Sequence, residues 1–151
     1  MDVLQYSAHD DPQLRGQVSL LACMALRSVL DGCKLTRVET KILVQIIEKT
    51  LKDKETSACR LALQGMQHFL PMALEGPFCI EIIPLLQSLL TLSENPYWLV
   101  RVDLLEVFGS LSWTALEFGL YSHQTCFNLP KFQEAFLRKH SVFALFIVVF
   151  N

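Results

Sequence analysis

The sequence predicts an all-α fold, an α-solenoid in which antiparallel helix pairs stack side by side, and three observations indicate it. Hydrophobic residues make up 52% of the 151 residues and charged residues 19%, which is too apolar for a disordered chain. Glycine and proline are scarce, with six of each, which disfavours a turn-rich β protein. Apolar residues recur at helical spacing in several successive segments.

The first two helices have recognisable boundaries. Asp11 can cap a helix over residues 12–30. Pro12 can occupy the first helical position, because its missing N–H costs no hydrogen bond there, and Asp31-Gly32 ends the helix. The second helix is predicted over residues 37–52. Its apolar positions follow helical spacing: Val38, Ile42, Leu43, Ile46, Ile47 and Leu51.

Three further helices are predicted with prolines near their ends or inside them. The third covers residues 56–70 and stops before Pro71, while the fourth covers 78–92. Pro84 should kink the fourth helix or move its start, because proline lacks a backbone N–H. The fifth starts with a cap at Asn95-Pro96 and runs to about residue 111.

The end of the chain is harder to assign. A last helix starts after Pro130 and continues into an apolar tail, and the run 142–150 is ambiguous between helix and strand because β-branched and aromatic residues dominate it. This run is too short for a membrane-spanning helix, which needs about 20 apolar residues. A buried solenoid helix, residues read out of frame at the end of a gene model, and an anchor lying on a membrane surface beside Arg138 and Lys139 remain alternatives for it.

An arginine marks an internal repeat. Arg15, Arg60 and Arg101 lie 45 and 41 residues apart, and apolar residues occupy the positions one before and three, six and ten after each of them. Those offsets fall on one face of a helix. The three sets are Leu14, Val18, Leu21 and Ala25; Cys59, Leu63, Met66 and Leu70; and Val100, Leu104, Val107 and Leu111.

The repeat length identifies the class of solenoid. Two antiparallel helices in about 40–47 residues are typical of HEAT and armadillo repeats. A single pair cannot bury its apolar face, so stacked pairs must share one core. The predicted organisation is a partial HEAT-like repeat at 1–35, repeats at 36–75 and 76–121, a loop at 122–129, and the start of a further repeat with an apolar tail at 130–151.

The arginines are expected to join neighbouring repeats. In HEAT repeats, which this pattern resembles, such an arginine can bond to an acidic cap in a neighbouring repeat. Asp11 fits that role, and Asp53 and Glu94 could substitute in the later copies. The alternative is that each arginine is simply solvated. Tyr97 and Trp98 precede the third arginine and could be an exposed binding anchor or could fill the junction between repeats, which their position favours.

The sequence offers no pattern for catalysis, metal binding or nucleic-acid binding. The net charge is -2, so no polyanion partner is expected, although Arg27, Lys34, Arg37 and Lys41 could meet a phosphate or an acidic partner. His123 and Cys126 form H-x-x-C without a second ligand pair. No nucleotide-binding, hydrolase or metalloprotease motif occurs. We expect no cofactor, no signal peptide, and five reduced cysteines.

Several short sequence segments resemble the huntingtin family, in the HEAT region of its N-terminal half. They are HDDPQLRG (9–16), KTLKDKETSACRLA (49–62) and YWLVRVDLLE (97–106), in the same order and rough separation, with looser similarity in FGL (118–120) and LPKFQEAFL (129–137). The resemblance covers about residues 3–137. The phrase YWLVR followed by an acidic residue, two leucines and glutamate is fairly specific.

The resemblance implies a function. It implies a non-catalytic scaffold for protein–protein interaction, cytoplasmic and also nuclear, that is linked to vesicle transport and selective autophagy and binds a huntingtin-associated helical protein. We expect the chain to be a segment of such a longer protein, with further HEAT repeats as its neighbours. The alternative is another HEAT adaptor, of the nuclear-transport or phosphatase-scaffold type.

Overall fold

The computed structural model describes residues 3–73 and 79–111, and in these residues all regular secondary structure is helical. The predicted elements at 122–129 and 130–151, the His123–Cys126 pair and the apolar run 142–150 lie outside the described residues. The described helices are α1 (Val3–Tyr6), α2 (Pro12–Leu30), α3 (Arg37–Leu51), α4 (Thr56–Ala73), α5 (Cys79–Leu92) and α6 (Trp98–Gly109).

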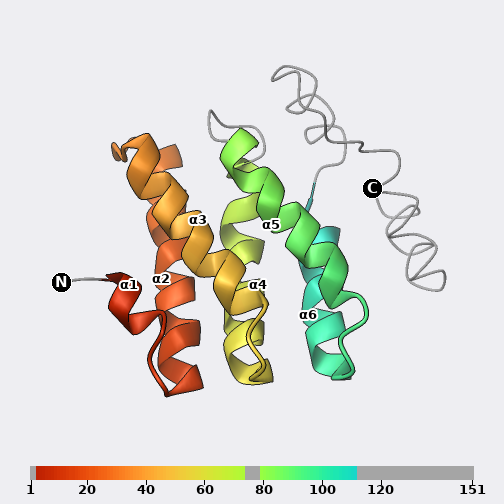
Figure 1. Ribbon diagram of the computed structural model, residues 1–151. Helices are drawn as coiled ribbons and strands as arrows, with labels where there is room; N and C mark the ends of the chain where they lie inside the picture. Colours follow the sequence, from red (N-terminus) through yellow and green to blue (C-terminus); the bar gives the residue numbers. More distant parts are fainter. Residues whose placement is uncertain (1–2, 74–78, 112–151) are drawn as a thin grey trace.

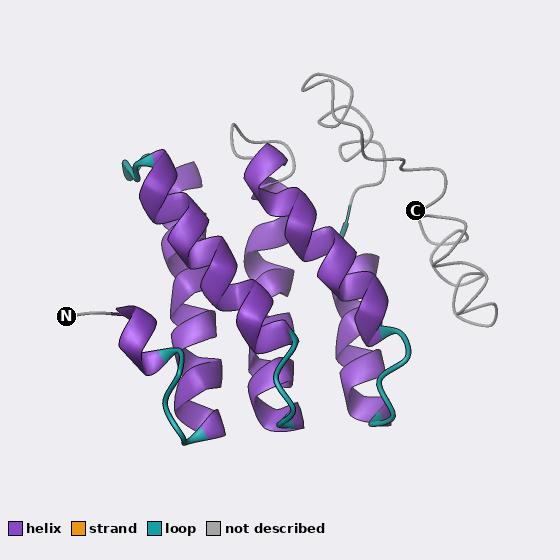
Figure 2. Ribbon diagram, in the orientation of Figure 1, coloured by secondary structure: helices purple, strands orange, loops and turns teal. Residues whose placement is uncertain are grey.

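The helices form two layers, as expected for an α-solenoid. Helices α2, α4 and α6 lie side by side in one row, and α3 and α5 lie across one side of that row (Figure 1). Short turns reverse the chain between α2 and α3, between α3 and α4 and between α5 and α6 (Figure 2). Helix α3 contacts both α2 and α4, and α5 contacts α3 and α6, so the pairs share a continuous core. The predicted fold class is therefore confirmed.

The apolar faces predicted for the second and third repeats are buried. Cys59, Leu63, Met66 and Leu70 are each at most 1% exposed, and so are Val100, Leu104, Val107 and Leu111. These eight residues belong to one hydrophobic cluster that includes side chains of α2, α3 and α5. The two copies thus have equivalent faces.

The face predicted to be buried in the first repeat is not the buried one. Leu21 is 62% exposed, Leu14 and Ala25 are only half-buried, and of the four predicted residues Val18 alone is buried. The buried side of α2 instead carries Gly16, Val18, Ser19, Ala22, Cys23 and Leu26. Counted from the arginine, the buried residues of α2 lie about one position later than those of α4 and α6. This difference corresponds to a rotation of about 100° about the helix axis.

Small residues explain the orientation of α2. A Cβ atom added at Gly16 would lie 2.6 Å from Leu61 Cδ1 and 3.1 Å from Ala58 Cα, both on α4. A Cβ atom added at Gly65 would lie 2.9 Å from Cys23 Sγ on α2. Helices whose contact residues are this small can approach closely, so α2 turns its glycine side toward α4. The leucines of the predicted face are thereby turned away from α4.

Side chains cap the starts of α2 and α3. Asp11 accepts a hydrogen bond from the backbone N–H of Gln13, as predicted, and Pro12 is the first residue of α2. Thr36 and Glu39 form a capping box in which each side chain bonds to the other residue's backbone N–H. That arrangement satisfies two N–H groups that would otherwise lack partners at the helix start. The helix prediction for 37–52 does not use this signal.

Two prolines lie inside the described helices, and one of them contradicts a predicted boundary. Helix α4 does not end before Pro71 but continues to Ala73, so the predicted boundary is wrong. Pro71 lies in the last turn, where losing one N–H bond removes little helix. Pro84 is the sixth residue of α5, beyond the first four residues whose N–H groups have no intrahelical partner, so it removes one hydrogen bond inside the helix. The observed start at Cys79 lies one residue after the predicted one, and the kink stays a prediction.

Candidate functional site

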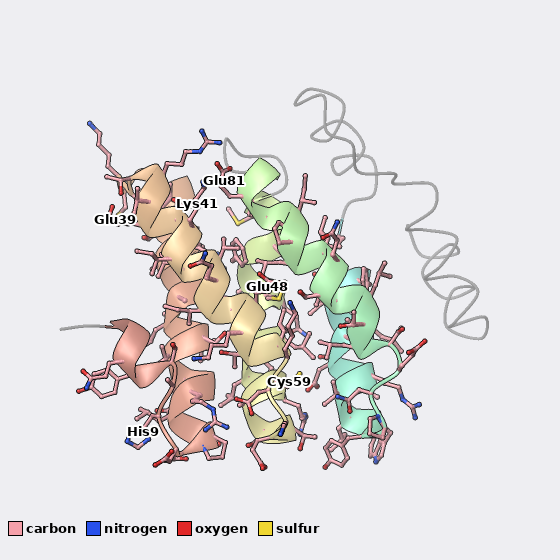
Figure 3. All side chains as sticks on the ribbon, in the orientation of Figure 1. His9, Glu39, Lys41, Glu48, Cys59 and Glu81 are labelled. Carbon is pink, nitrogen blue, oxygen red and sulfur yellow. The ribbon has the colours of Figure 1, made fainter. Side chains whose placement is uncertain are left out.

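The guanidinium group of Arg15 connects two successive helix pairs. Its Nε and Nη2 donate to Asp53 Oδ2 and Oδ1 at 2.6 and 2.9 Å. Its Nη1 donates to the carbonyl oxygens of His9 and Asp10 at 2.7 and 2.9 Å, in the turn before α2 (Figure 3 labels His9). The side chains of Arg15 and Asp53 are 16% and 12% exposed. This bidentate pair joins the start of α2 to the turn between α3 and α4.

Arg60 repeats the connection one pair further along. Its Nε donates to Asp103 Oδ2 at 2.6 Å and its Nη2 to Asp103 Oδ1 at 3.3 Å, which links α4 to α6. The side chains are 32% and 7% exposed. On the same helices, Gln67 Nε2, seven residues after Arg60, donates at 2.7 Å to Oε2 of Glu106, three residues after Asp103. The two arginines therefore form a short ladder of ion pairs along the stack.

One of the expected acidic partners is confirmed and another is wrong. Asp53 pairs with Arg15 as expected, whereas Asp11 caps its own helix and its role as an arginine partner stays a prediction. Arg60 bonds to Asp103, a residue that the repeat pattern does not predict, rather than to Glu94. A signal for Asp103 exists: it shares the spacing of the buried Val100, Leu104 and Val107 and is 5% exposed. A carboxylate on a buried stripe requires a cation or hydrogen-bond donors.

Arg101 stands apart from the other two arginines. It is exposed, and among the residues that the structure describes it forms no ion pair. Its position relative to the buried Val100 and Leu104 matches that of Arg60 relative to Cys59 and Leu63. Since Arg60 reaches toward α6, we infer that Arg101 lies on the side of α6 away from α4.

Tyr97 and Trp98 are exposed at the start of α6. Their exposed fractions are 39% and 58%, and Tyr97 occupies the cap position without a side-chain capping bond. The side chain of Asn95 accepts from the backbone N–H of Tyr97 at 2.9 Å instead. This exposure favours the contact alternative over the junction alternative within the described part of the chain.

The face of α6 that carries Trp98 differs in character from that of α4. The position three before the arginine is Ser57 in α4 and Trp98 in α6, and the position four after it is Gln64 in α4 and Leu105 in α6. Ser57 and Gln64 are exposed, and Leu105 is half-buried. The face that is polar and exposed on α4 is thus aromatic and aliphatic on α6. Aromatic side chains beside arginine are enriched among residues that dominate binding energies.

The basic cluster predicted around the first loop is partly engaged. Arg37 Nε donates to Glu81 Oε1 at 2.7 Å across the tops of α3 and α5 (Figure 3 labels Glu81). Arg27 Nη1 donates to the carbonyl oxygen of His68 at 3.1 Å. Two of the four basic side chains therefore hold neighbouring repeats, which leaves less charge for a phosphate or acidic partner.

Two cysteines in the core are poor candidates for chemistry. Burial raises the pKa of the Cys23 thiol well above its ordinary value. Burial also raises the pKa of Cys59 to about 12, and the nearby carboxylates of Asp103 and Asp53 add to this shift. Both thiols are thus protonated at neutral pH, whereas the thiolate is the form that reacts and binds metals. Within residues 3–73 and 79–111, no three side chains of the usual metal-binding types come together.

No helix in the described ranges is both long enough and apolar enough to cross a membrane.

Comparisons with known proteins agree with the repeat architecture. The family model described as "Huntingtin, N-terminal HEAT" matches residues 6–147. The chain is 30% identical over 132 residues to huntingtin of Takifugu rubripes and 24% identical over 131 residues to the HD protein homolog of Dictyostelium discoideum. Each match covers 78% of this chain and 4% of the relative. From the family match, together with the stacked, ion-paired helix pairs, we conclude that the chain belongs to the huntingtin N-terminal HEAT family.

Proposed function

We propose that this chain acts as a non-catalytic interaction scaffold, within a longer protein that takes part in vesicle transport and selective autophagy. Family membership supports the scaffold role in general terms. The further HEAT repeats of the longer protein would be its immediate neighbours. A helical protein associated with huntingtin is the partner we propose, in the cytoplasm and also in the nucleus.

The exposed aromatic face of α6 is the observation that carries this proposal. Trp98 is 58% exposed, and Arg101 lies one turn further along on the same side of the helix. An aromatic ring and a guanidinium group displayed together can bury a large area and donate several hydrogen bonds to a partner. The ion-paired stack behind α6 holds this face in a fixed orientation, so a partner would lose little free energy in ordering it.

The described cavity supports a non-catalytic role. It lies on α2 and is lined by Tyr6, Leu14, Val18, Leu21, Ala22, Ala25 and Leu43. An enzyme site needs polar groups that converge on a reacting atom. Here the only polar side-chain group among the lining residues is the hydroxyl of Tyr6.

An affinity experiment with two matched variants tests the proposal. The immobilised chain should retain proteins of the vesicle-transport and autophagy machinery from cell extract, identified by mass spectrometry. Trp98→Ala should reduce this retention at least about tenfold, which corresponds to about 1.4 kcal/mol. Val38→Ala is the control, because Val38 is 67% exposed near the start of α3.

Two results would count against the proposal. Retention that is equal for Trp98→Ala and Val38→Ala would remove the α6 face from the interaction. Retention of nuclear-transport receptors or phosphatase subunits in place of vesicle and autophagy proteins would favour the other HEAT adaptor class, although the family match is to huntingtin.

A further inference from the structure

In the described part of the chain, two ion pairs of the same kind attach α5 and α6 to the helices before them. Arg37 on α3 donates to Glu81 on α5. Arg60 on α4 donates to Asp103 on α6. Both carboxylate side chains are 7% exposed, whereas the side chains of Arg37 and Arg60 are 68% and 32% exposed. In each attaching ion pair, a buried carboxylate on α5 or α6 therefore meets a guanidinium group that remains in contact with water.

This arrangement ties the position of α5 and α6 to the state of the attaching ion pairs. A carboxylate that stays buried without its cation is costly, because a charge in an apolar environment is strongly disfavoured. An exposed arginine loses little when it turns back to water. Asp103 can therefore separate from Arg60 only if α6 moves far enough for water to reach the carboxylate, and the same holds for Glu81 on α5. Breaking these contacts and moving the two helices are thus one event.

The contact between α2 and α4 is built differently. The side chains of Arg15 and Asp53 are both largely covered, and Arg15 also donates to two backbone carbonyl oxygens in the turn before α2. The hydrogen bond from Arg15 is the main reason that the pKa of Asp53 lies below its ordinary value. Gly16 and Gly65 also bring α2 and α4 close together. This contact is therefore held by close packing as well as by its ion pair.

No comparable glycine packing joins α4 to α6 in residues 3–73 and 79–111. Each of these two helices contains one glycine. Gly65 of α4 faces Cys23 of α2, and a Cβ atom added at Gly109 of α6 meets nothing within 4 Å. Larger side chains and polar contacts join α4 to α6 instead, and packed helices of this kind can slide by small amounts against each other.

We propose that α5 and α6 form a movable unit, which the two attaching ion pairs of Glu81 and Asp103 hold against α3 and α4. With both ion pairs closed, the unit has the orientation seen in the structure. With both open, it turns as one body while α2, α3 and α4 keep their arrangement. A rotation of about 15°, as in known rigid-body transitions, would move the far end of α5 by about 5 Å, because its 14 residues span about 21 Å.

The movement changes the direction in which the exposed face of α6 points. Trp98 and Arg101 both lie on the movable unit. A partner that contacts this face and the α3–α4 pair together would find the two surfaces in the right geometry only when the attaching ion pairs are closed. This consequence for a partner rests on the proposed function, whereas the movement itself is a property of the chain alone.

Pulsed electron–electron double resonance on the full chain measures the movement. Spin labels on a keto amino acid, which leaves the native cysteines unmodified, are placed at exposed positions. Labels at Gln17 and Thr91 report the α2–α5 distance, and labels at Gln17 and Lys49 report the α2–α3 distance as a matched reference. Raising the salt concentration from about 0.1 to about 1 M shortens the Debye length from about 10 to about 3 Å. The α2–α5 distance should then shift or broaden by about 5 Å, while the reference stays unchanged.

Two substitutions separate this device from an ordinary stabilising contact. Asp103→Asn removes the charge without leaving a buried carboxylate, whereas Arg60→Gln leaves Asp103 without its cation. Arg60→Gln should therefore broaden the α2–α5 distance more than Asp103→Asn does, and the double variant should return to the narrower distribution of Asp103→Asn. Asp53→Asn, at the contact that glycine packing also holds, is the control and should leave both distances unchanged. Circular dichroism checks that each variant keeps its helices.

Three results would overturn the proposal. One is an α2–α5 distance that salt and the variants leave as narrow as the reference. Another is broadening of both distances together, because the movement would then not be confined to α5 and α6. The third is an equal effect of Arg60→Gln and Asp103→Asn without recovery in the double variant, which would make the pair an ordinary contact. The salt comparison needs no substitution at the ion pairs. Since no partner is present, these outcomes are independent of the retention experiment with Trp98→Ala.

Discussion

Leu104→Asp is expected to unfold the helix pair formed by α5 and α6 at neutral pH. Leu104 is 0% exposed and belongs to the central hydrophobic cluster, in which Val100, Val107 and Phe108 of the same helix are equally buried. Truncating a buried leucine costs about 2–5 kcal/mol, and a carboxylate at the same place adds the cost of removing a charge from water. The sum is comparable with the whole stability of a typical domain, which is about 5–15 kcal/mol.

Circular dichroism at 222 nm during urea denaturation measures this effect. The variant should lose the helical signal of α5 and α6 in water, and protease should cut first in the segment after α4. Val38→Asp is a suitable control, because Val38 is exposed at the second position of α3, where the helix dipole favours an acidic residue. Its stability should stay within about 0.5 kcal/mol of the wild type. An unchanged midpoint for Leu104→Asp would refute the assignment of α6 to the shared core.

Helical periodicity predicted most of the fold, because the shared core selects apolar residues at helical spacing. The predicted helices at 12–30, 37–52 and 78–92 agree with the described ones to within one residue at each end. The faces centred on Leu63 and Leu104 are buried as predicted. Helix α4 packs against α2, α3 and α6, and α6 packs against α4 and α5. These neighbours fix which face of each helix is turned inward, so the pattern in the sequence reflects a real constraint.

The orientation of α2 could not be predicted in the same way. Its leucines are spaced as regularly as those of α4, yet Leu21 faces solvent while Met66 at the equivalent position is buried. The deciding factor is close contact between Gly16 and Leu61 and between Gly65 and Cys23, across 45 and 42 residues of sequence. Periodicity counts apolar residues, but it does not record that small residues on two distant helices fit each other.

For the ion pairs, the sequence predicted the arginines but not all of their acidic partners. An arginine at the same place in each repeat predicted contacts between neighbouring pairs, and Arg15 and Arg60 make them. Their partners lie at unlike positions: Asp53 precedes α4, whereas Asp103 lies inside α6. A long, flexible guanidinium side chain can reach either position, so the repeat constrains the cation more tightly than the anion. The exposure of Trp98 likewise depends on which neighbours surround α6 in space.

Gly16→Ala is expected to destabilise the protein by about 1–3 kcal/mol, although alanine ordinarily stabilises a helix interior by about 0.5–1 kcal/mol relative to glycine. The added methyl group would lie 2.6 Å from Leu61 Cδ1 and 3.0 Å from Leu61 Cβ. The end of a leucine side chain can move, but Ala58 Cα at 3.1 Å belongs to the backbone of α4. The substitution must therefore push α2 and α4 apart, which weakens the packing of the whole row.

Urea denaturation with a matched glycine distinguishes this packing effect from helix propensity. Gly109 ends α6, and a Cβ atom added there meets nothing within 4 Å, so Gly109→Ala should be neutral or slightly stabilising. Leu61→Ala in the Gly16→Ala background should cost less than it does alone, because the shortened side chain relieves part of the clash. If Gly16→Ala instead stabilises the chain as much as Gly109→Ala or more, α2 cannot approach α4 closely. The orientation of α2 that exposes Leu21 would then be wrong as well.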